Sequence, residues 1–147
     1  MSDARARAVP PGTREAAQLL TGESQKDRPM SALTHFAEQP ETRAYAAGDV
    51  VFREGDESDG RMYVLIEGAV RASREGRELE TLAAAGDVFG EIGLIDRLPR
   101  SATVHAEQAT RVVVVDEQSF RLLILRNPTF ALEIMRMLTR RARANLL

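Results

Sequence analysis

The sequence predicts an α+β fold with a short N-terminal helix, an antiparallel, jelly-roll-like β-roll of about eight strands and two C-terminal helices. Two observations support this prediction. Between residues 43 and 116, short runs rich in Val, Ile, Tyr and Ala are separated by glycines, as in strands joined by tight turns. From residue 117 onward, apolar residues recur every three or four positions, which is the spacing of amphipathic helices.

The length and composition fit one globular domain. The chain has 147 residues, of which 44% are hydrophobic, and its formal net charge of −2 gives no overall attraction to nucleic acid. It contains no cysteine, which excludes disulfides and thiolate metal sites. No apolar run is long enough to cross a bilayer, and the first residues do not resemble a secretory signal. We therefore expect a cytoplasmic protein without a membrane partner.

The first elements are a tail and a short helix. Residues 1–28 combine Arg, Ala and a Pro-Pro-Gly run without sustained periodicity, which favours a flexible tail. Ser31 is a candidate N-cap and Pro40 is a stop signal, so a helix is expected over residues 31–39. The folded domain is accordingly expected over residues 29–147.

The β-roll is expected over residues 43–116. Its clearest strands are the apolar and β-branched runs at residues 62–68, 69–73, 78–83 and 110–116. The glycines between such runs supply turns with positive φ at little steric cost.

Two helices are predicted over residues 117–126 and 128–145, with Pro128 in the first turn of the second helix. The second helix has an apolar stripe, and its arginines at 136, 140 and 143 form a separate face. A basic face near a helix C-terminus is ordinarily solvated. The apolar stripe is expected to pack on the core or the ligand base, or to serve a protein partner or self-association.

Between the strands, the segment FGEIGLIDRLPRSATV at residues 89–104 has a different character. Glycines flank a possible short helix over residues 91–95, whose first backbone N–H groups would attract an anion. Arg100 offers a planar fork of donors suited to a phosphate. Glu91 is acceptor-only when ionised and would hold a sugar hydroxyl. Together these groups suit a molecule with a phosphodiester and a free ribose 2′-hydroxyl.

This segment resembles the phosphate-binding cassette of the cyclic-nucleotide-binding family. That family includes regulatory subunits of cAMP-dependent kinase, catabolite-activator-type regulators and cyclic-nucleotide-gated channels. The family pattern is FGE, a hydrophobic residue, a small residue and Leu, and later PR, a small residue, Ala, Thr or Ser, and Val. Residues 89–94 and 99–104 meet this pattern at every position. The resemblance extends over about residues 31–145 and implies a β-roll that binds a cyclic nucleotide.

The resemblance also implies roles for individual residues. Arg100 would contact the cyclic phosphate and Glu91 the ribose 2′-hydroxyl. The other cassette residues expected at the ligand are Phe89, Gly90, Ile92, Gly93, Ser101 and Ala102. The family's base-facing wall lies on the strands before the cassette, where alternation and position nominate Ala72, Thr81 and Ala83. The last helix commonly supplies a lid, for which Met135, Arg136 and Leu138 are the candidates.

We therefore expect a stand-alone receptor for cAMP that signals by rearrangement of its C-terminal helices. The Ser101 hydroxyl is also compatible with cGMP. No cofactor or metal is expected, since His35 and His105 are too few and too separated for a metal site. No catalytic motif occurs, which argues against an enzyme. Two alternatives stay open. One is an interaction or dimerisation module without physiological nucleotide binding, and the other is the sensor of a truncated transcription regulator without its helix-turn-helix DNA reader.

Overall fold

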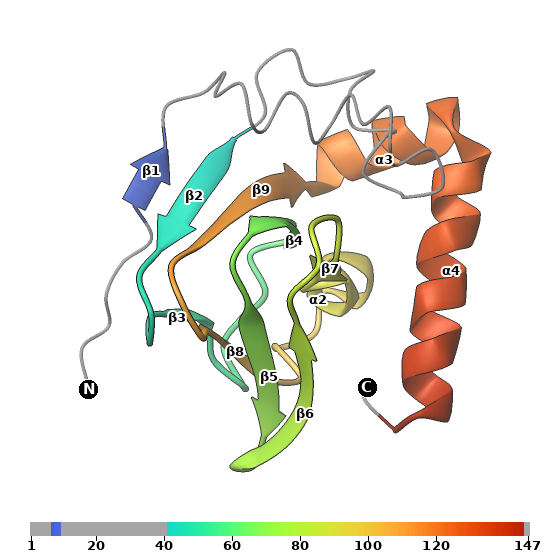
Figure 1. The fold of residues 1–147 in the computed structure, drawn as a ribbon. Helices are drawn as coiled ribbons and strands as arrows, with labels where there is room; N and C mark the ends of the chain where they lie inside the picture. Colours follow the sequence, from blue (N-terminus) through green and yellow to red (C-terminus); the bar gives the residue numbers. More distant parts are fainter. Residues whose placement is uncertain (1–6, 10–40, 146–147) are drawn as a thin grey trace.

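The computed structural model describes residues 7–9 and 41–145, which form two antiparallel sheets and three helices (Figure 1). One sheet contains, in spatial order, β1 (Arg7–Val9), β2 (Thr42–Tyr45), β9 (Thr110–Asp116), β4 (Arg61–Glu67) and β7 (Val88–Phe89). The other contains β3 (Val50–Phe52), β8 (Thr103–Ala106), β5 (Val70–Arg74) and β6 (Arg77–Leu82). The helices are α2 (Glu91–Asp96), α3 (Glu117–Arg126) and α4 (Pro128–Arg143).

This architecture confirms the predicted fold class. Strands β2 to β9 form the antiparallel roll between residues 42 and 116, and α3 and α4 follow it. The helix α3 has the predicted bounds, whereas α4 ends two residues earlier than expected. Residues 7–9 lie within the predicted tail but form β1, which pairs with β2. The helix expected over residues 31–39 lies outside the described residues.

Strand β4 is central because both of its faces are buried. Its residues Met62, Val64 and Ile66 pack in one cluster with apolar residues of α3 and α4. Tyr63 and Leu65 point the other way, into a second cluster inside the roll. A strand that contributes to two cores needs a nearly continuous apolar run. The run MYVLI at residues 62–66 meets that need.

The two C-terminal helices are fixed at their first turns by side-chain caps. The Asp116 carboxylate accepts a hydrogen bond of 2.8 Å from the backbone N–H of Ser119, at the start of α3. The Asn127 side chain accepts one from the N–H of Phe130, and Pro128 occupies the first turn of α4. Caps of this kind stabilise a helix start by about 1 kcal/mol. They place the bend between α3 and α4 at Asn127, from which α4 descends beside the roll (Figure 1).

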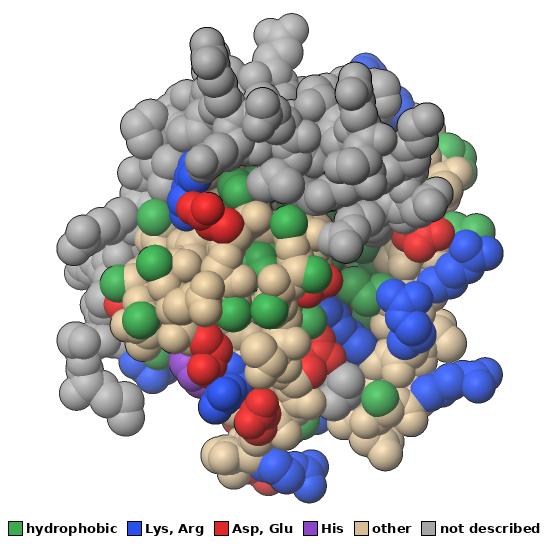
Figure 2. Space-filling model, in the orientation of Figure 1, with side chains coloured by type: hydrophobic (Ala, Val, Ile, Leu, Met, Phe, Trp, Pro, Cys, Tyr) green, Lys and Arg blue, Asp and Glu red, His purple; other side chains and the backbone are tan. Residues whose placement is uncertain are grey.

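Helix α4 is anchored near its start by burial. Phe130 and Ile134 are buried, and the Phe130 ring meets Phe120 of α3 edge-on at 5.7 Å between centroids. Basic side chains are prominent along the α4 edge of the molecule (Figure 2). None of the helices in the described ranges is both long and apolar enough to span a membrane.

Candidate functional site

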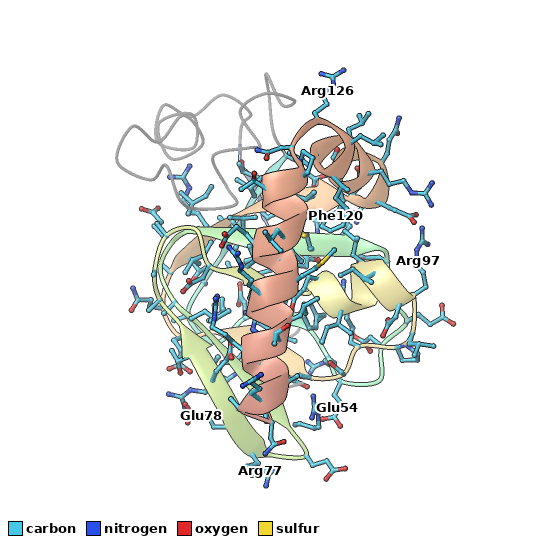
Figure 3. The ribbon with its side chains drawn as sticks, turned by 90° about the vertical axis from the view of Figure 1, so that its right-hand side faces the viewer. Glu54, Arg77, Glu78, Arg97, Phe120 and Arg126 are labelled. Atoms are coloured by element: carbon cyan, nitrogen blue, oxygen red, sulfur yellow. The ribbon has the colours of Figure 1, made fainter. Side chains whose placement is uncertain are left out.

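Both ends of segment 89–104, but not its middle, line one side of a pocket. The pocket is open to solvent, and the free space within it and in front of its mouth is about 570 Å³. Its walls come from β3, β5, β6, β7, β8, the segment around α2, and α4. The lining residues are Phe52, Val70, Ala72, Leu79, Glu80, Leu82, Phe89, Gly90, Glu91, Ile92, Gly93, Arg100, Ser101, Ala102, Val104 and Arg141. Figure 3 shows α4 in front, between the β5–β6 hairpin on one side and α2 on the other.

A left-handed glycine starts the short helix of this segment. Gly90 is the N-cap of α2 with φ of 77°, a conformation that residues with a side chain seldom adopt. It turns the chain from β7 directly into α2, so Glu91 becomes the first helical residue. The helix predicted over residues 91–95 is therefore present and ends one residue later, at Asp96.

Arg100 is buried, with 4% of its surface exposed, and is held in one orientation. Its Nη1 donates to the carbonyl of Gly90, and its Nη2 donates to Asp59 and to the carbonyl of Arg61, each at 2.9 Å. The guanidinium carbon lies 4.2 Å from the centroid of the Phe52 ring. These contacts point a buried cation into the pocket with little side-chain freedom left to lose on binding.

An aromatic cluster lies beneath this arginine. The rings of Phe52, Tyr63 and Phe89 have centroids 5.2 to 6.4 Å apart. Burial raises the pKa of Tyr63 to about 12, and the nearby Asp59 carboxylate adds to the rise. The phenol therefore stays neutral at physiological pH, so the aromatic cluster next to Arg100 carries no charge.

Glu91 is 2% exposed and has two differently placed oxygens. One oxygen, Oε1, accepts a hydrogen bond from Nη1 of Arg141 on α4. The other, Oε2, is buried and has no hydrogen-bond partner within the described part of the chain. A buried acceptor without a donor costs about 1 to 3 kcal/mol. Glu91 is therefore suited to a hydroxyl brought by a ligand.

Arg141 connects three parts of the site. Besides Glu91, its Nη2 donates to the carbonyl of Val88 at 2.6 Å and lies 3.2 Å from the Glu80 carboxylate. Neither Arg141 nor Glu80 was among the site residues predicted from the sequence. The signal for Arg141 was its position seven residues after Ile134, which puts it on the apolar stripe of α4.

The lid candidates named from the sequence do not line the pocket. Met135 and Arg136 are exposed, and Leu138 packs against the cluster between the sheet and the helices. Arg141 is the residue of α4 that lines the pocket.

The structure brings most of the predicted site residues together. All eight expected residues of the cassette line the pocket, namely Phe89, Gly90, Glu91, Ile92, Gly93, Arg100, Ser101 and Ala102. Ala72 of β5 lines it as well.

Thr81 and Ala83 do not line this pocket. Thr81 pairs with Arg71 across the β5–β6 ladder, on the opposite face from the pair formed by Ala72 and Glu80. It is exposed, and its hydroxyl donates to Glu78. Ala83 is also exposed and follows the end of β6. The residues of β6 that face the pocket are Leu79, Glu80 and Leu82.

Comparisons with known proteins identify the family of this chain. Residues 42–127 match the sequence model of the cyclic nucleotide-binding domain. A putative potassium channel protein of Rhodopseudomonas palustris is 35% identical over 118 residues, which are 78% of this chain and 28% of the channel. A CRP-like cAMP-activated global transcriptional regulator of Mycobacterium tuberculosis is 32% identical over 117 residues, which are 77% of this chain and 52% of the regulator.

Solved structures show the same fold. The catabolite activator protein of Thermus thermophilus superposes with a TM-score of 0.68 and 29% identity, covering 85% of this chain and 58% of that one. The cAMP-bound PfPKA-R superposes with a TM-score of 0.69 and 27% identity, covering 88% and 43%. With the family match spanning 86 residues, from 42 to 127, the chain belongs to the cyclic nucleotide-binding domain family.

Proposed function

We propose that this chain is a receptor module for cAMP, in which Arg100 binds the cyclic phosphate and Glu91 binds the ribose 2′-hydroxyl. The observation that carries the proposal is the placement of these two buried, oppositely charged side chains on one pocket. Two of the relatives are named for cAMP, a regulator activated by it and a structure bound to it. The module acts by binding, with no chemical step.

The donor count of Arg100 supports the phosphate role. A guanidinium has five N–H donors. Hydrogen bonds to Gly90, Asp59 and Arg61 use three of them within the described residues, which leaves two for a ligand. A cyclic phosphate carries one negative charge and two free oxygens, so it matches both the charge and the remaining donors.

The Glu91 role predicts discrimination against a deoxy sugar. Isothermal titration of the parent should show saturable binding of cAMP, and binding of 2′-deoxy-cAMP should be at least about 10-fold weaker, because Oε2 of Glu91 stays without a donor. In a Glu91→Gln variant the difference in affinity between cAMP and 2′-deoxy-cAMP should be smaller, since the acceptor loses its charge. A parent that binds neither cAMP nor cGMP contradicts the proposed function. Equal affinity for the deoxy analogue contradicts the role of Glu91 alone.

We further propose that nucleotide binding changes the position of α4 and thereby the surface offered to a protein partner. The support for this step is Arg141, which joins α4 to the same carboxylate that would hold the ribose. A ligand can move α4 only if it binds one arrangement better than the other. Entry of a hydroxyl at Glu91 provides such a difference, because it alters the hydrogen bonding of the carboxylate that Arg141 contacts.

The absence of cysteine makes this motion measurable. Cysteines introduced at two exposed positions, Ala83 beside the pocket strand β6 and Arg140 on α4, would be the sole labelling sites for a fluorophore pair. The energy transfer between the labels should change as cAMP saturates the protein. It should stay constant in the same pair carrying Arg100→Ala. An unchanged signal in a protein that demonstrably binds cAMP would refute the proposed motion.

A further inference from the structure

One carboxylate stands in an otherwise apolar row of the pocket wall. Val104 of β8, Ala72 of β5 and Glu80 of β6 are direct neighbours across three paired strands. The next row along the same face consists of Ala106, Val70 and Leu82. Direct cross-strand neighbours share one face of a sheet, and both rows pack toward the inside of the roll. Glu80 is therefore the one ionisable side chain in these two rows.

A β-bulge aims this part of β6 at the pocket. Ala72 pairs with Glu80 and Ser73 pairs with Glu78, so Leu79 is an extra residue on β6 without a partner. A bulge of this kind re-aims neighbouring side chains. Here Leu79 and Glu80 both line the pocket, although consecutive strand residues ordinarily point to opposite faces.

The position of Glu80 relative to the other polar groups follows from their contacts. Arg100 and Ser101 lie on the phosphate side of the proposed site, and Glu91 is at the ribose position. Arg141 contacts both Glu91 and Glu80, so Glu80 lies one side chain away from the proposed ribose position, on the β5–β6 wall of the same pocket. In a nucleoside the base is the group beyond the ribose. The Glu80 side chain is 19% exposed, so its charge is largely removed from water.

We propose that Glu80 reads the base by accepting a hydrogen bond from its exocyclic amino group. This inference rests on the proposed function. A carboxylate only accepts hydrogen bonds, so it favours a base edge that presents an N–H donor and disfavours one that presents a lone pair. Adenine presents such a donor at N6 and guanine at N2. The contact from Arg141 keeps Glu80 paired with a cation before a base arrives.

Pairs of cyclic nucleotides that differ only in this amino group test the inference. The 3′,5′-cyclic monophosphate of purine riboside lacks the N6 amino group of cAMP, and cIMP lacks the N2 amino group of cGMP. The parent should bind the aminated member of one pair about 10-fold more tightly than its partner, as expected for a hydrogen bond to a charged group. The pair that shows the difference identifies the base that Glu80 contacts.

Variants separate this role from a structural one. In Glu80→Ala the ratio of the two dissociation constants should fall to about 1, whereas Glu78→Ala on the same strand should keep the parent ratio. Glu78 is a matched control because it is exposed and bonds to Thr81. If Glu80 only held α4 through Arg141, its loss would weaken both nucleotides equally, and an unchanged ratio would overturn the inference.

The parent protein alone provides a second test that needs no variant. If it binds cAMP and cGMP no more tightly than their analogues without the amino group, Glu80 is not the base reader. If it binds no cyclic nucleotide at all, the proposed function itself has failed, so the two failures are distinguishable.

Discussion

Replacement of Arg100 by alanine should weaken cAMP binding at least about 100-fold, which corresponds to about 3 kcal/mol. The substitution removes the buried cation that the proposed phosphate site needs. It also removes the donor to the carbonyls of Gly90 and Arg61, so the cassette loses its link to the start of β4. Asp59 tolerates the loss because 45% of its side chain is exposed.

The measurement is isothermal titration of parent and variant with cAMP. Arg97→Ala is the matched control, since Arg97 is three residues away, exposed, and paired with Glu117 on α3. The control should bind as the parent does. Arg100→Lys keeps the charge but lacks the planar fork, so its affinity should fall between those of the parent and the alanine variant. If Arg100→Ala bound cAMP as tightly as the parent, the proposed role of Arg100 in binding the phosphate would be wrong.

Gly68→Ala should destabilise the fold by about 3 kcal/mol, the largest stability effect that we expect from a single added methyl group. Gly68 joins β4 to β5 with φ of +97°. A Cβ there would lie 2.5 Å from both the carbonyl oxygen of Ala109 and the hydroxyl of Thr110. Thr110 cannot easily move, because it is buried and its hydroxyl bonds to Ala69 and to the carbonyl of Gln108.

Urea denaturation of parent and variant measures this loss. Gly76→Ala is the matched control, since Gly76 also has a positive φ, of +77°, but has open space around its Cβ position. The control should lose only about 1 kcal/mol of stability, which is the cost of a positive φ for a residue with a side chain. Equal losses in the two variants would show that the crowding at Thr110 is relieved by a shift of the chain.

Much of this fold and site is predictable from sequence because the signals are local. Glycine-separated strands predict the roll, and Pro128 marks the boundary between two helices. The cassette is a continuous segment, so its residues fall on one pocket once α2 forms. Glu91 and Arg100 both meet that pocket for this reason.

The remaining site residues depend on information that a local pattern does not carry. Alternation along β6 nominated Thr81 and Ala83. Which of the alternating residues face the pocket is set by the pairing register of the strand, and here the register contains a bulge at Leu79. Arg141 lies 50 residues after Glu91, and only the packing of α4 brings the two together. Asp59 and Phe52 similarly reach Arg100 from the loop before β4 and from β3.

The two ends of α4 are held by different forces. Near Asn127 the helix is held by buried aromatic and aliphatic side chains, whereas over residues 139–145 Arg141 alone is not exposed. Dissolved salt weakens attraction between opposite charges but does not weaken apolar contacts. Because Glu91 and Glu80 are largely removed from water, rising ionic strength loosens the Arg141 end only partly, and it leaves the Asn127 end in place. Helix α4 can therefore rotate about its packed N-terminal end when the charged contacts of Arg141 are broken.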